Sequence, residues 1–192
     1  MAGIVRIAIQ SKNKKDWRFI MARELAPMAD NLYRTIFNKL NMPLIEGSED
    51  IECTIDEAKA RYDWEEGIDC LLYFTNGVKA TLQEKYLTYW KSTATFEESK
   101  NSGKPGAWYY CTAQYYFVGY ARKYLHEKVL AFQDWIMIDL PNIHRKDATK
   151  NLNWQYNKNK KDGRRSPFRY LNFKDVPTDC IVARKGIESR RL

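Results

Sequence analysis

An Asn-Gly pair between two apolar runs is the feature that most restricts how this chain can fold. Residues 69–74 read DCLLYF, Asn76-Gly77 follows shortly after, and residues 78–86 form a second run with strand-forming side chains. Glycine accepts the positive φ of a tight turn without steric cost, so this arrangement is a strong signal for a β-hairpin. The sequence therefore predicts an antiparallel pair of strands over residues 69–86.

The rest of the chain mixes helix and strand patterns. Apolar side chains that recur every three or four residues predict a helix over residues 14–40, divided or kinked at Pro27. Strands are predicted over residues 4–9, 134–140, 168–173 and 180–183; Pro141 ends the second of these before a loop, and residues 44–66 look irregular. Residues 107–128 stay ambiguous, because Trp108 to Tyr110 favour a strand whereas residues 114–126 fit a helix at least as well. This order predicts an α+β (mixed α/β) fold in one domain, residues 1–192.

The hairpin brings three chemically useful side chains to one place. Gln83 and Lys85 are two residues apart on the second strand and project from the same face, while Glu84 projects from the other. With Asn76-Gly77 as the turn, Asp69 lies opposite about Glu84, within one residue of both Gln83 and Lys85. An acid, an amide oxygen and an ammonium group therefore converge at one sheet edge.

Such a set suits metal-dependent hydrolysis of a phosphodiester. Mg²⁺ prefers oxygen ligands and keeps several waters, so one or two protein oxygens and a substrate phosphate are sufficient. The cation lowers the pKa of a bound water and stabilises the charge that develops on phosphorus. A nearby lysine orients that water, or helps to deprotonate it, and offsets phosphate charge.

These residues also resemble a known family. The stretch Gly67-Ile68-Asp69, Asn76-Gly77 and Leu82-Gln83-Glu84-Lys85 is similar to the core of the PD-(D/E)XK nuclease superfamily, in the variant with Gln in the second half-motif. It most resembles the small phage and prophage-type members, over roughly residues 57–90. The resemblance implies a restriction-endonuclease-like core of helices on a mixed sheet, DNA as substrate and Mg²⁺ or Mn²⁺ as cofactor. It also implies that Asp69 is a metal ligand, that Gln83 offers a neutral oxygen, and that Lys85 lies beside the nucleophilic water.

A neutral ligand binds Mg²⁺ more weakly than a carboxylate does, so another acid is expected in the metal site. The family often supplies one from the preceding helix. We favour Glu57, in a predicted helical turn before the first strand, with Glu24 as second choice. Glu84 qualifies only if a bulge turns it inward, and the remaining candidates before the hairpin are Asp63 and Glu66.

The charge of the chain is uneven. The net charge is +8, and residues 144–192 hold 14 Lys and Arg against 5 Asp and Glu, whereas residues 1–143 hold 18 against 19. The basic excess is densest where aromatic residues are interleaved with it, which suits a phosphate backbone with bases that stack on rings. The predicted DNA contacts are Lys158, Lys160, Lys161, Arg164 and Arg165. A solubilising loop and tail is an equally acceptable interpretation of the charge alone.

Other features narrow the function by exclusion. The chain has no apolar run of the roughly 18 residues that a membrane span needs, nor a signal peptide, so we expect no membrane partner. Four widely spaced cysteines predict reduced thiols in the cytoplasm of a bacterial cell or phage-infected host. The aromatic run from Tyr115 to Tyr120 favours core packing.

The resulting hypothesis is a metal-dependent deoxyribonuclease; the alternative is a non-catalytic nucleic-acid-binding or protein-interaction accessory protein. Whether the chain forms a homodimer stays open.

Overall fold

The computed structural model describes residues 2–9, 17–53, 66–87, 92–99, 104–121, 131–157 and 167–186. Its helices are α1 (Trp17–Lys39), α3 (Ala107–Tyr110) and α4 (Leu140–Ala148), with short 3₁₀ turns η1 (Phe173–Asp175) and η2 (Thr178–Cys180). Its strands are β1 (Ile4–Ile9), β2 (Ser48–Cys53), β3 (Cys70–Tyr73), β4 (Lys79–Leu87), β5 (Thr93–Glu97), β6 (Tyr115–Tyr120), β7 (Asp134–Asp139), β8 (Gln155–Asn157), β9 (Phe168–Asn172) and β10 (Ile181–Arg184). The predicted α+β class is confirmed.

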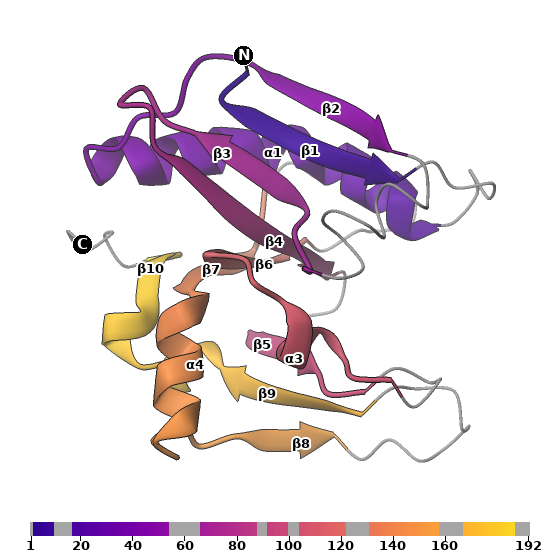
Figure 1. Ribbon diagram of the computed structural model, residues 1–192, viewed down its shortest axis with the longest axis vertical. Helices are drawn as coiled ribbons and strands as arrows, with labels where there is room; N and C mark the ends of the chain where they lie inside the picture. Colours follow the sequence, from indigo (N-terminus) through magenta and orange to yellow (C-terminus); the bar gives the residue numbers. More distant parts are fainter. Residues whose placement is uncertain are drawn as a thin grey trace.

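Two sheets make up the β structure. The larger has seven strands in the order β10-β7-β6-β4-β3-β1-β2, and the smaller has three in the order β5-β9-β8. The large sheet is mixed, because β1 runs parallel to β2 and β4 parallel to β6, while its other neighbours are antiparallel. Figure 1 shows α1 alongside β1 to β4, and the small sheet with α3 and α4 gathered in the other half of the molecule.

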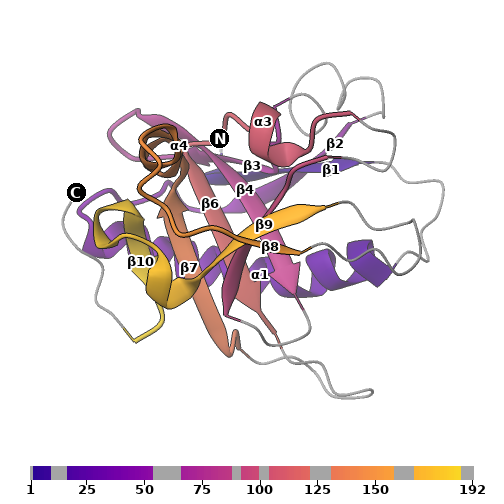
Figure 2. The same ribbon diagram turned by 90° about the horizontal axis from the view of Figure 1, so that it is seen from below.

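The large sheet has a separate apolar core on each face. Side chains of α1 such as Leu25, Tyr33 and Phe37 pack with Leu72, Leu82 and others on one face. On the other face Tyr116, Val118 and Ile138 pack with residues of β5, β9, α3 and α4. Alternate residues of a strand point to opposite faces, so β4 contributes to both layers. The small sheet and its two helices therefore form a layer over the face that α1 leaves open, and Figure 2 shows this layer from below.

The predicted hairpin is confirmed, with a register one residue away from the expected one. Cys70 pairs with Leu82, and Tyr73 with Lys79. Gly77 has a φ of 82°, in the left-handed region that glycine adopts readily. The Asn76 side chain accepts a hydrogen bond from the backbone N–H of Val78 at 3.1 Å, which fixes the turn. The one-residue shift leaves Gln83, rather than Glu84, nearest to Asp69.

The long helix is confirmed, but Pro27 does not divide it. α1 continues through Pro27, which is exposed and lies between the buried residues Leu25 and Ala29. Proline in a helix removes one backbone hydrogen bond. Burial of the apolar stripe on the sheet offsets this loss, because Tyr33 and Phe37 are fully buried beneath the helix.

Within residues 107–120, the helix and the strand lie the other way round from what local propensity indicates. Trp108 and Tyr109 lie in the short helix α3, and residues 115–120 form the strand β6. β6 is hydrogen-bonded to β4 on one side and to β7 on the other. A central position in a sheet selects a strand even where helical spacing is present. The expectation that this aromatic run packs in the core is confirmed, since Tyr116, Phe117 and Tyr120 are buried.

Two further expectations were wrong. Residues 48–53 form β2, because pairing with β1 orders a segment whose composition looks irregular. The strand before Pro141 ends as predicted, at Asp139, but a helix follows it instead of a loop: Pro141 lies in the first turn of α4, where a missing N–H costs nothing. The carboxylate of Asp139 caps that turn by accepting a hydrogen bond from the N–H of Asn142 at 2.9 Å. Among the described residues, no helix is long and apolar enough to cross a membrane.

Candidate functional site

The hairpin brings Asp69 and Gln83 into direct contact. The Nε2 of Gln83 donates a hydrogen bond to Oδ2 of Asp69 at 2.5 Å, and the backbone N–H of Glu84 donates to the same oxygen at 2.7 Å. The backbone N–H of Asp69 in turn donates to the carbonyl of Leu82 at 2.9 Å. The predicted convergence of the acid and the amide at the start of β3 is therefore present.

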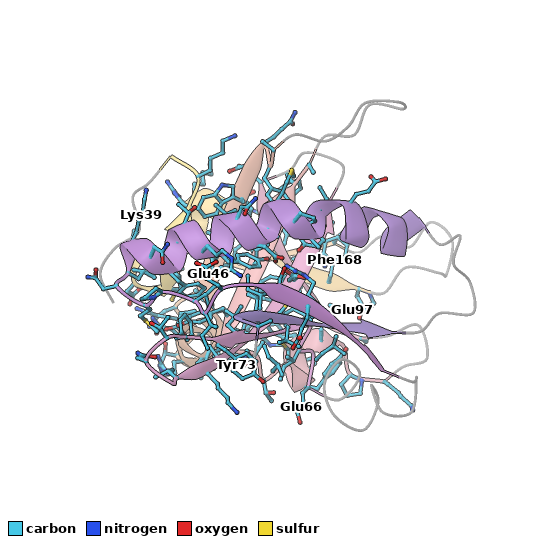
Figure 3. The ribbon with its side chains drawn as sticks, turned by 90° about the horizontal axis from the view of Figure 1, so that it is seen from above. Lys39, Glu46, Glu66, Tyr73, Glu97 and Phe168 are labelled. Atoms are coloured by element: carbon cyan, nitrogen blue, oxygen red, sulfur yellow. The ribbon has the colours of Figure 1, made fainter. Side chains whose placement is uncertain are left out.

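Gln83 and Lys85 also line a cavity of about 360 Å³ between the large sheet and the layer that covers it. The opposite wall comes from β5, α3, α4 and β9 and includes Glu97, Trp108, His144 and Phe168. Asp69 is not part of the lining, and its carboxylate contacts the cavity through Gln83. Glu97 and Phe168 are paired across β5 and β9, and both are labelled in Figure 3.

Lys85 is held inside this cavity with little compensation for its charge. Its Nζ donates a hydrogen bond to the carbonyl of Thr95 at 3.3 Å. Burial lowers the pKa of the Lys85 ammonium to about 8, and the nearby Glu97 carboxylate opposes this shift only in part. A lysine with such a pKa exchanges its proton near neutral pH, which an ordinary surface lysine does not do.

Cys111 lies next to the amide of Gln83. Its thiol donates a hydrogen bond to the carbonyl of Gly67 at 3.2 Å, and the sulfur is 3.8 Å from Oε1 of Gln83. Burial raises the pKa of Cys111 to about 12, so the thiol stays protonated. Gly67 has a φ of 61°, and a Cβ there would lie 3.0 Å from both the Cys111 sulfur and Oε1 of Gln83. Glycine is therefore required where the chain enters β3.

His144 and Trp108 form the most closely stacked part of the cavity wall. Their ring centroids are 4.2 Å apart with an interplanar angle of 33°. Burial lowers the pKa of His144; Asp147 opposes this shift and the guanidinium of Arg169 adds to it. The imidazole is therefore neutral at neutral pH.

Of the four acids expected before the hairpin, the described residues include Glu24 and Glu66; neither lines the cavity, and the backbone carbonyl of Glu66 accepts a hydrogen bond from the N–H of Thr112 at 2.8 Å. Glu57 and Asp63 lie outside the described residues, as do Lys158, Lys160, Lys161, Arg164 and Arg165. Glu24 belongs to α1, on the face opposite to Gln83 and Lys85. The described residues contain no cluster of three or more His, Cys, Asp or Glu that could hold a metal.

Glu84 lies on the face that the sequence predicts, opposite to that of Gln83 and Lys85. No bulge turns Glu84 inward: its carboxylate accepts hydrogen bonds from Arg6 and Tyr33 on the α1 face. Glu97, which no pattern in the sequence singles out, contributes a carboxylate to the cavity wall. Thr95, Cys111, Trp108 and His144 were overlooked as site residues as well, and no spacing rule connects them to the hairpin.

The donors at the hairpin fit a hard cation of the Mg²⁺ type. A carboxylate and an amide oxygen are the ligand types that such a cation prefers, and it completes its shell with water and substrate oxygens. Asp69 and Gln83 are the residues that would hold it. As placed, the amide group presents its N–H to Asp69, so the amide has to turn over before its oxygen faces the carboxylate.

Comparisons with known proteins add no further information. No family model, no curated protein and no solved structure matches this chain.

Proposed function

We propose that this chain is a metal-dependent nuclease that hydrolyses DNA phosphodiester bonds. The observation that carries the proposal is that Asp69 is in contact with Gln83, and that Gln83 lines one cavity with Lys85. The resemblance of residues 57–90 to the PD-(D/E)XK superfamily supports the same assignment. We include in this proposal that the fold has a restriction-endonuclease-like core.

Each residue has a defined task in this reaction. Asp69 and Gln83 would hold Mg²⁺ or Mn²⁺ through their oxygens, and a bound cation would acidify water and offset charge on the phosphate. Protonated Lys85 donates to a phosphate oxygen, and neutral Lys85 accepts a proton from the attacking water, which a pKa of about 8 permits. The water oxygen forms the new bond to phosphorus, the bond to the leaving sugar oxygen breaks, and that oxygen takes a proton from solvent.

Metal-dependent cleavage by paired variants tests the proposal. Single-stranded, double-stranded and branched DNA are incubated with the protein and Mg²⁺ or Mn²⁺, and with EDTA as a control. We expect Lys85→Met and Asp69→Asn each to lower the cleavage rate by at least about 100-fold, the usual effect of losing an acid–base or electrostatic group. Lys79→Met is the matched control, because Lys79 lies on the same strand but is exposed. A folded protein that leaves every DNA intact with both metals would refute the proposal.

A second candidate function has an observation of its own. The Asp69 carboxylate accepts two N–H donors as the structure stands, which is also how a purely structural aspartate is satisfied. A non-catalytic DNA-binding protein would keep this arrangement. It would bind DNA in a salt-dependent way, and its binding would not change with Mg²⁺ or with Asp69→Asn.

A further inference from the structure

The face that carries Gln83 and Lys85 is covered. Lys85 bonds to the backbone of Thr95 on β5, and α3, α4 and β9 supply the rest of the opposite wall. B-DNA is a thick rod whose major groove alone is about 12 Å wide. A duplex cannot lie flat on a sheet face that another layer covers, whereas a single strand is thin enough to enter between the layers.

The cavity has two kinds of lining. Polar groups come from Gln83, Lys85 and Glu97, and flat rings come from Trp108, His144 and Phe168. Its volume of about 360 Å³ falls in the range of small-molecule sites. A nucleotide has the matching composition, with one charged phosphate and one flat base that stacks on rings.

The ring wall is rigid. Trp108 is only 5% exposed and contacts Phe96 edge-on at 5.1 Å and Trp154 edge-on at 5.1 Å. The guanidinium of Arg169 lies 5.0 Å from the Trp108 ring, and Arg169 is itself fixed by ion pairs with Glu98 and Asp147. A wall that is already ordered does not lose side-chain freedom when a ligand binds.

We propose that this cavity takes one unpaired nucleotide of DNA, with its base against the rings of His144 and Phe168 and its phosphate toward Lys85, while Trp108 packs behind His144 and holds it in place. This inference rests on the proposed nuclease function and specifies its substrate as single-stranded or locally unpaired DNA. The neutral state of His144 agrees with contact to a base rather than to a phosphate. A base in a duplex has to be unpaired and unstacked before it can enter, which slows the reaction on duplex DNA.

Matched substrates test the inference. Four DNAs of one sequence are compared with Mn²⁺: a single strand, a blunt duplex, a duplex with an internal bulge, and a duplex with a single-stranded flap. We expect the single strand, the bulge and the flap to be cut at least about 100-fold faster than the blunt duplex, with cuts confined to the unpaired nucleotides. A blunt duplex cut as fast as the single strand would overturn the inference and leave the nuclease proposal intact.

Variants of His144 test the role of the ring. We expect His144→Ala to slow cleavage of the single strand at least about 10-fold by loss of base stacking, and His144→Phe to restore most of the rate. Phenylalanine cannot transfer a proton, so rescue would exclude an acid–base role. Tyr109→Ala is the control, because Tyr109 is 61% exposed and outside the cavity. An unchanged rate in a folded His144→Ala protein, or no rescue by His144→Phe, would contradict the proposal.

A measurement of DNA binding distinguishes the proposed nucleotide site from the proposed nuclease function. Asp69→Asn protein is titrated with a fluorescent single strand and with the same strand carrying one abasic position moved along it. We expect a single abasic position to weaken binding about 10-fold or more at one register. If no DNA is ever cut but this register dependence is present, the nuclease proposal fails and the nucleotide site stands. If abasic positions have no effect, the nucleotide site fails.

Discussion

The buried charged side chains on the two faces of β4 differ in how their charge is compensated. On the α1 face, Glu84 accepts hydrogen bonds from Arg6 at 3.0 and 3.2 Å and from the hydroxyl of Tyr33 at 2.8 Å. Arg6 also forms an ion pair with Asp30 at 2.5 Å. On the cavity face, one residue further along, Lys85 bonds to a backbone carbonyl and has Glu97 as its nearby carboxylate.

The pKa shifts express this difference. Burial alone would raise the pKa of Glu84, but the charge and hydrogen bonds of Arg6, together with the hydroxyls of Tyr86 and Tyr33, outweigh burial and lower it. Burial also acts on Lys85, and there it prevails, so the pKa falls to about 8. The fold thus stabilises the ionised form of Glu84 and destabilises the ionised form of Lys85. Structural ion pairs have the first property, and functional groups held ready for a substrate charge have the second.

The largest expected loss of stability comes from a change at Glu84, on the face of β4 that α1 covers. Glu84→Gln leaves Arg6 buried without its main partner, and we expect the free energy of unfolding to fall by about 3–5 kcal/mol. Urea denaturation at pH 7 measures it. Glu49→Gln is the control, because Glu49 is an exposed residue on β2. A loss below about 1 kcal/mol would mean that this ion pair is worth no more than one on the surface, and the contrast between the faces would disappear.

On the face of β4 that lines the cavity, we expect removal of the buried charge to raise stability instead of lowering it. The folded-state pKa of Lys85 lies below its ordinary value of 10.5, so wild type carries a penalty while Lys85 is protonated, below about pH 8. The penalty is relieved as pH rises from about 8 toward 10.5. We expect Lys85→Met to be more stable than wild type at pH 7 by about 3 kcal/mol, the free energy of such a shift. Urea denaturation from pH 7 to 10.5 should show this difference shrinking.

Lys79→Met is the control for the pH series, since Lys79 is exposed on the same strand. The Lys79→Met protein should keep the pH dependence that Lys85 confers on wild type. A Lys85→Met protein that is less stable than wild type at pH 7 would show that the Thr95 and Glu97 contacts compensate burial after all.

The contrast between the faces was partly visible in the sequence. Asn76-Gly77 is a local signal, and side-chain alternation along one strand is a geometric rule, so the hairpin and the separation of Gln83 and Lys85 from Glu84 could be predicted. Asp69 was placed to within one residue, because the turn allows registers that differ by one, and only the pairing of Cys70 with Leu82 decides between them.

The rest of the site depends on contacts between distant segments. Arg6 and Glu84 are 78 residues apart in sequence, and nothing local indicates that they meet. The cavity wall brings together Glu97, Trp108 and His144 from three further elements. Residues 115–120 have helical spacing, and only their position between β4 and β7 makes them a strand. The sequence therefore predicts what one hairpin does, but not which layer covers it.

A smaller effect is expected from the neutral partner of Glu84. Tyr33→Phe removes one hydroxyl that donates to a carboxylate and keeps the ring, which packs edge-on against Phe117 at 5.1 Å. We expect a loss of about 1.5–2 kcal/mol, the lower part of the range for a hydrogen bond to a charged group. Tyr109→Phe is the control at an exposed position. Equal stability of Tyr33→Phe and wild type would indicate that Arg6 alone satisfies Glu84.

The smallest expected effect on stability comes from Gly77, in the turn of the hairpin, and it tests whether this turn fixes the register of β4. At Gly77 an added Cβ meets no atom within 4 Å, so Gly77→Ala costs only the strain of its φ of 82°, about 1 kcal/mol. Gly186→Ala is the matched control, since Gly186 has a φ of 76° and equally open surroundings outside the hairpin. Both should lose similar stability by urea denaturation, and Gly77→Ala should keep the pH dependence that Lys85 confers on wild type. If Gly77→Ala abolishes that dependence, the hairpin has slipped by one residue, because such a slip moves Lys85 to the α1 face and Glu84 to the cavity.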